Sequence, residues 1–156
     1  MAKLYYKFSS MNAGKSTNLL QIAFNYKERG YNTLIFTSAL DDRYGTGKVT
    51  SRIGIDADAI IIPKDDVTVL SSARNSLISE QIAAIFVDEC QFLSKEQVDI
   101  LGEIVDEYDI PVFCYGIRTD FESKLFSGSQ RLFEIADSIE ELRNICQCGK
   151  LSLIHI

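Results

Sequence analysis

The sequence lacks long hydrophobic runs and an excess of positive charge, and both absences narrow the range of possible functions. No stretch reaches the roughly 20 apolar residues that span a membrane, and the N-terminus lacks the apolar core of a signal peptide. The sequence contains 16 lysines and arginines and 22 aspartates and glutamates, which gives a net charge of −6. Because a nucleic-acid groove requires a basic face, we expect neither nucleic acid nor a membrane as a partner.

Internal repeats and low-complexity linkers are also absent from the sequence. The 156 residues, of which 46% are hydrophobic and 24% charged, are sufficient for one domain with a buried core and too few for two ordinary ones. The four cysteines accompany no secretory signal, so they favour a reducing compartment. We therefore expect a cytoplasmic protein built around a single main domain.

The clearest motif is a phosphate-binding loop at residues 9–17. These residues follow the pattern G-x-x-x-x-G-K-[ST], except that the first glycine is replaced by Ser9. An apolar segment at residues 4–8 precedes the loop, and an amphipathic helix follows it, with Leu19, Ile22, Ala23 and Tyr26 on one face. A strand, a loop and a helix in this order are the context that the motif requires. The stretch therefore predicts a nucleotide-binding loop.

The chemistry of this loop favours ATP with magnesium. Successive backbone N–H groups form an anion-binding nest, and the N-terminus of the helix adds a partial positive charge. Lys15 can reach the outer phosphates, and the Ser16 hydroxyl can bind a magnesium ion. A small nucleotide needs only these local donors, so the acidic composition does not exclude it. The expected ATP-binding residues here are Ser9, Ser10, Met11, Asn12, Ala13, Gly14, Lys15 and Ser16.

A second motif lies at residues 84–92, where an apolar run ends in two acids. A buried strand would deliver Asp88 to the edge of the sheet, where it can hold magnesium directly or through water. Glu89 is expected to point elsewhere and is the candidate general base. Cys90 and Gln91 follow directly and are expected beside the nucleotide.

The remaining pattern predicts alternating strands and helices. The expected strands cover residues 4–8, 33–37, 59–62, 84–88 and 111–116, and residues 41–55 are expected to form a long loop. The first helix should end near Arg29 with Gly30 as its left-handed C-terminal residue, and part of 65–81 should be helical. Ser94 and Gln97 form a capping box for another helix, whose buried stripe would be Val98, Leu101, Val105 and Tyr108. This alternation predicts an α/β fold with a mostly parallel sheet covered on both faces.

The ordered motifs together resemble the type II thymidine kinases. The resemblance rests on residues 11–16, 88–92 and 115–121, and on the shorter segments 41–43 and 146–149, and it covers the chain through Lys150. It implies a RecA-like P-loop nucleotide-binding core over residues 1–143, followed by a small zinc-ribbon lobe. It also implies transfer of the γ-phosphoryl group of ATP to the 5′-hydroxyl of thymidine, giving dTMP for DNA synthesis. Members usually assemble as homo-tetramers.

The same resemblance implies roles for individual residues. Glu89 matches the catalytic base, and Asp88 matches the acid of the magnesium site. Met11, Phe92, Ile117 and Phe121 match the walls of the thymine pocket; the alternative for these four is ordinary hydrophobic core. Arg43 and Arg118 are candidates for stabilising charge near the phosphates, with surface salt bridges as the alternative.

The cysteines fall into two groups. Cys90 and Cys114 lie in or beside apolar strands and are expected to be small core residues. Cys146 and Cys148 have the spacing of half a zinc site, and structural zinc requires four ligands. The family supplies the other two from a later stretch, which residues 151–156 do not resemble, although His155 is conceivable as a third ligand. We therefore expect an incomplete zinc-binding lobe over residues 144–156, in a truncated or frame-shifted product.

Two other functions remain open from the sequence. A RecA-like ATPase would use Glu89 to activate water in place of a nucleoside hydroxyl, but it would not explain residues 115–121 or the cysteine pair. A catalytically impaired nucleotide-binding fragment is the other alternative, and the unusual C-terminal residues favour it.

Overall fold

A computed structural model describes residues 1–9, 15–39, 43–51, 54–117 and 126–142. Its centre is a seven-stranded sheet in the order β3-β4-β2-β5-β6-β1-β7, in which β3 pairs antiparallel with β4 and the other pairings are parallel. The strands are β1 (Leu4–Ser9), β2 (Asn32–Ser38), β3 (Thr46–Thr50), β4 (Asp56–Ile62), β5 (Ile82–Asp88), β6 (Val112–Ile117) and β7 (Ser138–Glu141).

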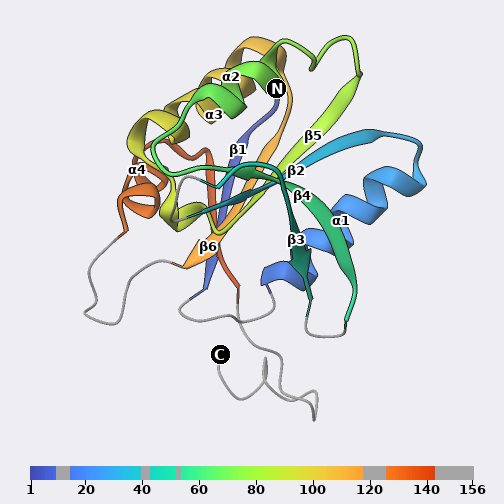
Figure 1. Ribbon diagram of the computed structural model, residues 1–156, viewed down its shortest axis with the longest axis horizontal. Coiled ribbons are helices and arrows are strands. Elements are labelled where there is room, and N and C mark those ends of the chain that lie inside the picture. The colour runs from blue at the N-terminus through green and yellow to red at the C-terminus, as the bar shows by residue number, and fades with distance from the viewer. Residues whose placement is uncertain (10–14, 40–42, 52–53, 118–125, 143–156) are drawn as a thin grey trace.

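Helices cover both faces of this sheet. Figure 1 shows α1 on one face and α2, α3 and α4 together on the other. The helices are α1 (Lys15–Glu28), α2 (Thr68–Arg74), α3 (Lys95–Tyr108) and α4 (Ser127–Ile135), and a short 3₁₀ turn, η1 (Cys90–Phe92), follows β5. The α/β architecture with a mostly parallel sheet, expected from the sequence, is confirmed.

The central strands bury side chains on both faces, which explains why they are almost continuously hydrophobic. In β5, Ile85 and Val87 pack into the larger core with α2, α3 and α4, whereas Ala84 and Phe86 pack with α1. In β6, Cys114 lies in the larger core and Phe113 in the smaller one. Cys90 and Cys114 are both fully buried, as the sequence predicts.

The sequence located the other regular elements through local signals. All five expected strands are present, and α1 ends at Glu28 with Gly30 at a φ of 83°. The capping box of α3 forms as predicted, since Ser94 accepts a hydrogen bond from the Gln97 amide and Gln97 reaches back to the Ser94 amide. The weak pattern at 65–81 contains α2, which is only seven residues long.

The prediction of a long loop over residues 41–55 is wrong, because Thr46–Thr50 forms the edge strand β3. Only Val49 of these five residues is buried, so the strand lacks the apolar run by which the other strands were recognised. Gly47 permits a close approach to β4, where an added Cβ would lie 3.3 Å from the Ile61 side chain. Helix α4 and strand β7 were not predicted either.

The buried stripe of α3 differs slightly from the prediction. Val98, Leu101 and Val105 are buried as expected, but Ile104 is also buried, and Tyr108 is only partly buried against the core. No helix within the described ranges is long and apolar enough to cross a membrane. The expected zinc-binding lobe over residues 144–156 lies outside the described residues.

Candidate active site

The site forms where the carboxyl ends of three parallel strands meet. Strand β6 lies between β5 and β1, so the residues that follow β1 and β5 emerge on either side of the end of β6. Strand β1 ends at the fully buried Ser9, and α1 begins at Lys15. Open α/β sheets bind ligands at this edge. The intervening phosphate-loop residues, Ser10, Met11, Asn12, Ala13 and Gly14, lie outside the described part of the chain.

Lys15 connects the phosphate-loop helix to both acids of the second motif. Its Nζ donates hydrogen bonds to Asp88 Oδ1 at 2.9 Å and to Glu89 Oε1 at 2.5 Å, although the residue is only 3% exposed. Burial alone would lower the pKa of Lys15, but attraction to the two carboxylates and the hydrogen bonds to them outweigh burial and raise it. Lys15 is therefore a buried cation held between two acids.

The two acids differ in their access to solvent. The Asp88 side chain is 7% exposed and the Glu89 side chain is 32% exposed. The pKa of Asp88 is raised, because desolvation by burial is the largest influence on its carboxylate and the neighbouring Glu89 charge adds to it, against the attraction of Lys15. Asp88 is thus the enclosed acid, and Glu89 is the more accessible one.

The sequence predicted that Glu89 would point away from Asp88, and this prediction is wrong. The Glu89 carboxylate accepts a hydrogen bond from the same Lys15 ammonium group as Asp88 does. The alternation of side chains along a strand applies only as far as Asp88, where β5 ends. Glu89 has a φ of 55° and a ψ of 38°, in the left-handed region, which turns the chain into η1. This turn brings the Glu89 carboxylate back to Lys15, so both carboxylates contact the same ammonium group.

Gln91 contacts the other oxygen of the Glu89 carboxylate. Its Nε2 donates to Glu89 Oε2 at 2.8 Å, and its Oε1 accepts a hydrogen bond from the Ile117 amide at 3.1 Å. Gln91 is 1% exposed, so both ends of its side-chain amide are committed inside the protein. The sequence placed Gln91 beside the nucleotide without indicating these partners.

Four of the other predicted site residues are half-buried or exposed. Ser16 is half-buried in the first turn of α1, and Arg43 is exposed shortly before β3, whose first residues lie at the carboxyl edge of the sheet. Phe92 is half-buried and packs edge to face against Phe126, with the ring centroids 5.6 Å apart. Ile117 is half-buried at the end of β6. Arg118, Phe121, Cys146 and Cys148 lie outside the described residues.

The sequence analysis did not identify the small residues at the start of α4, which pack against η1 and the end of β6. Ser129 is fully buried and donates a hydrogen bond from Oγ to the Ile117 carbonyl at 2.8 Å, and Ser127 donates from Oγ to the Leu93 carbonyl at 3.2 Å. A Cβ on Gly128 would lie 2.3 Å from the Cys90 carbonyl oxygen. The run of small residues at 127–129 was the available signal for such close packing.

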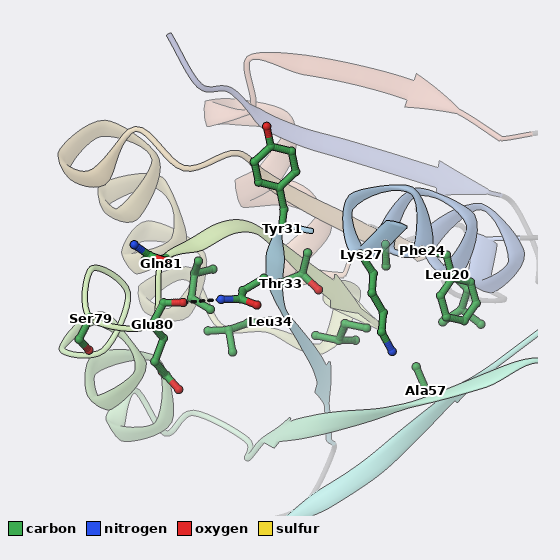
Figure 2. Close-up of a pocket in the computed structure, with 14 residues that line it drawn as sticks. Leu20, Phe24, Lys27, Tyr31, Thr33, Leu34, Ala57, Ser79, Glu80 and Gln81 are labelled. Atoms are coloured by element: carbon green, nitrogen blue, oxygen red, sulfur yellow. Dashed lines mark hydrogen bonds between the residues drawn. The ribbon is translucent and has the colours of Figure 1, made fainter. Parts of the chain in front are cut away.

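A separate hollow lies far from these groups, at the opposite end of the sheet. It has a volume of about 720 Å³ and lies between α1 and the amino-terminal ends of β2 and β5. Figure 2 shows Lys27, Tyr31 and Ala57 around it, together with the hydrogen bond from Asn32 to the Glu80 carbonyl. None of the predicted site residues lines this hollow.

The acids also define what kind of metal the site can hold. The described part of the chain contains no group of three or more histidine, cysteine, aspartate or glutamate residues that could bind a metal by themselves. Magnesium in phosphoryl-transfer sites needs only one or two carboxylates, because substrate phosphates and water complete its shell. The carboxylate of Asp88, beside the lysine of a phosphate loop, fits that requirement.

Lys15 begins the helix that follows the phosphate loop, and the two acids lie at the end of a parallel strand that is separated from β1 by one strand, β6. This arrangement defines a P-loop nucleotide-binding protein. The family model described as thymidine kinase matches residues 2–155. The chain therefore belongs to the thymidine kinase family.

Individual relatives agree with this assignment. A thymidine kinase of Shewanella oneidensis is 54% identical over 152 residues, which cover 96% of this chain and 78% of the relative. Thymidine kinases of Haemophilus influenzae and Vibrio cholerae are 53% and 55% identical over 150 residues, again 96% of this chain and 77% and 78% of theirs. The chain thus spans somewhat more than three quarters of the length of these relatives.

Proposed function

We propose that this chain transfers the γ-phosphoryl group of ATP to the 5′-hydroxyl of thymidine, giving dTMP. The main support is the convergence of Lys15, Asp88 and Glu89, which hydrogen-bond to one another. In the proposal they act as a phosphate-binding group, a metal-binding acid and an accessible base. Phosphoryl transfer depends mainly on positioning and electrostatic stabilisation, so this small set of groups is sufficient in kind. Membership of the thymidine kinase family supports the same reaction.

In this proposal the phosphate loop and Lys15 hold the ATP phosphates. The loop amides at residues 10–14 and the N-terminus of α1 bind phosphate oxygens, and Lys15 neutralises charge on the outer phosphates. The buried position of Lys15 strengthens its attraction for anions, because little water screens it. Asp88 and Ser16 would hold magnesium, which supplies neutralisation of the charge that develops on the transferred phosphoryl group.

Glu89 would accept the proton from the 5′-hydroxyl of thymidine. A general base must be reachable by its substrate, and the Glu89 side chain is 32% exposed where that of Asp88 is 7% exposed. Lys15 and Gln91 each contact one of its two oxygens, which fixes the direction of the carboxylate. The exposure and orientation of Glu89 therefore support its role as the base.

The nucleoside would lie beside the ends of β6 and η1. Phe92 and Ile117 come from these two elements and are both half-buried, which leaves part of each side chain for contact with thymine. We propose that Met11 and Phe121 complete the pocket, and that Arg43 and Arg118 stabilise charge near the phosphates. Cys90 and the phosphate-loop residues 9–16 remain part of the proposed ATP site.

A coupled assay separates this function from the two alternatives. Purified chain is incubated with ATP and magnesium, with and without thymidine, and both ADP and dTMP are measured. The kinase predicts that ADP forms together with an equal amount of dTMP and only when thymidine is present. Thymidine-independent ADP would support an ATPase, and ATP binding without turnover would support an impaired nucleotide-binding fragment. A chain extended to the full length of the relatives would show whether additional residues are needed for activity.

Zinc binding and assembly are further parts of the proposal. Cys146 and Cys148 would contribute two of the four ligands of a structural zinc ion, so the site requires ligands from elsewhere. We also propose that the protein assembles as a homo-tetramer, works in the cytoplasm, and has neither nucleic acid nor a membrane as a partner.

A further inference from the structure

We propose that Gln91 is a positioning residue that fixes the Glu89 carboxylate and ties it to the end of strand β6. This inference rests on the proposed kinase function, in which Glu89 is the base. Its geometric basis is a chain of three groups: the Ile117 amide donates to Gln91 Oε1 at 3.1 Å, and Gln91 Nε2 donates to Glu89 Oε2 at 2.8 Å.

The chemistry of the two neighbours allows only one orientation of the Gln91 amide. The backbone N–H of Ile117 can only donate, so it must face the amide oxygen. The ionised carboxylate of Glu89 can only accept, so it must face the amide nitrogen. A flipped amide would place donor against donor and acceptor against acceptor, and burial of Gln91 would leave no water to compensate. Gln91 therefore presents a fixed N–H donor to Glu89.

Two glycines allow the backbone to approach Gln91 and η1 closely. A Cβ on Gly116 would lie 2.6 Å from Gln91 Oε1 and 2.8 Å from Cys90 Sγ, so this glycine provides the space that the amide occupies. From the other side, Gly128 packs closely against the backbone of η1, where an added Cβ would lie 2.9 Å from the Leu93 carbonyl and 3.2 Å from the Gln91 carbonyl. The side chain is held by hydrogen bonds at both ends of its amide, and the backbone that carries it is packed against Gly128.

The two contacts of Glu89 differ in how ATP would affect them. Lys15 holds Oε1, but phosphates bound by the loop would compete for the same ammonium group. Gln91 holds Oε2, and its two side-chain partners among the described residues, Glu89 and the Ile117 amide, are not groups that phosphates would displace. We infer that Gln91 keeps the carboxylate in place when Lys15 engages ATP.

The other end of Gln91 places the base relative to the nucleoside. Ile117 is the last residue of β6 and directly precedes residues 118–125, which contain the proposed substrate contacts Arg118 and Phe121. Ser129 fixes the carbonyl of Ile117 at 2.8 Å, so both backbone polar groups of this residue are engaged. Gln91 thus joins the base to the segment that is expected to carry its substrate.

A double-mutant cycle on the full chain tests this role. Gln91→Met keeps the size of the side chain but removes both hydrogen bonds, and Glu89→Gln removes the base. We expect Gln91→Met to lower kcat about 10- to 100-fold, since small misplacements of a catalytic group have effects of that size. The KM for ATP should change less than about threefold, because Lys15 and Asp88 are untouched. In the Glu89→Gln background, Gln91→Met should cause no further loss of kcat.

Two other variants make the test specific. Gly116→Ala keeps Gln91 and Glu89 but crowds Gln91 Oε1, so it should reproduce the loss of kcat. Gln97→Met is the matched control, because Gln97 is equally buried and hydrogen-bonded, to the carbonyls of Pro63 and Asp66, but lies at the start of α3. It should lower the urea midpoint and leave kcat unchanged. Undiminished kcat in a folded Gln91→Met protein, or equal losses in both Glu89 backgrounds, would overturn the proposal.

Failure of the proposed function would be visible separately. If wild-type protein forms no dTMP from thymidine, the kinase function is wrong, whatever the variants do. A second cycle that pairs Gln91→Met with Glu89→Met is then followed by urea unfolding, because a glutamine at position 89 could still accept the hydrogen bond from Gln91 Nε2. A non-additive shift of the midpoint would show that Gln91 holds Glu89 in the folded state, whereas additive shifts would contradict that contact as well.

Discussion

The ammonium group of Lys15 lies between the carboxylates of Asp88 and Glu89, at 2.9 Å from the first and 2.5 Å from the second. These residues are 73 and 74 positions apart in the sequence and come from opposite sides of strand β6. One buried cation therefore links the phosphate-loop helix to the strand that carries the acids.

Removing the ammonium group should weaken both nucleotide binding and the fold. We expect Lys15→Met to weaken ATP binding about 30-fold or more, because a buried charged contact to the phosphates is lost. It should also lower the free energy of unfolding by about 3 kcal/mol, since two neighbouring carboxylates lose their counter-charge. Calorimetric titration with ATP and urea unfolding measure the two effects. Lys27→Met, an exposed position of the same helix, is the control and should change neither. Unchanged ATP affinity in folded Lys15→Met protein would remove Lys15 from the phosphate site.

Replacing the proposed base should affect turnover much more than binding. Glu89→Gln keeps the size and polarity of the side chain but cannot accept the substrate proton, so kcat should fall by about 10²–10⁴. ATP affinity should change little, because Lys15 retains its contact with Asp88. Steady-state kinetics with thymidine as the varied substrate measure the loss. Glu96→Gln, at an exposed position of α3, provides a carboxylate control with normal turnover. Normal kcat in a folded Glu89→Gln protein would end the assignment.

The buried thiol of Cys114 should make the protein less stable in alkali. Complete burial raises its pKa above the ordinary 9.0, so the folded chain keeps a proton that the unfolded chain loses. The stabilising effect of this thiol is full below its unfolded pKa and is lost as the pH rises above it, at about 1.4 kcal/mol per pH unit. Between about pH 8 and about pH 10.5, Cys114→Ala should therefore lose about 2 kcal/mol less stability than the wild type. Urea unfolding at several pH values tests this, and equal pH slopes for the two proteins would contradict it.

The zinc content should depend on the C-terminal cysteine pair. Two thiolates cannot close a tetrahedral structural site, so we expect less than one zinc ion per chain in a purified protein that consists of residues 1–156 alone. Replacing both Cys146 and Cys148 with serine should abolish that zinc. Cys114→Ala should leave it unchanged, because Cys114 is buried in the core. Mass spectrometry of the metal content measures the result. Stoichiometric zinc that survives mild chelation would show instead that His155 or another chain completes the site.

Several features could be predicted from the sequence because their determinants are close together in it. The phosphate loop is readable because the apolar strand, the Gly14-Lys15 pair and the helical periodicity follow one another directly. The capping box of α3 is readable because Ser94 and Gln97 are three residues apart and bond to each other. The five predicted strands are recognisable by their apolar residues, and the central strands β5 and β6 bury side chains on both faces. Local hydrogen bonding and periodicity thus determined most of the α/β framework.

The tertiary structure alone decided the features that depend on distant partners. Edge strand β3 buries only Val49, so its existence follows from pairing with β4 and not from its own composition. Glu89 reaches Lys15 because of a left-handed turn that no residue type at that position announces. Gln91 meets Ile117 across 26 residues, in space that Gly116 leaves open. The sequence names the groups of the site, but their distances and partners depend on how strands and helices pack. Packing is a property of the whole chain, so these relationships could not be predicted from neighbouring residues.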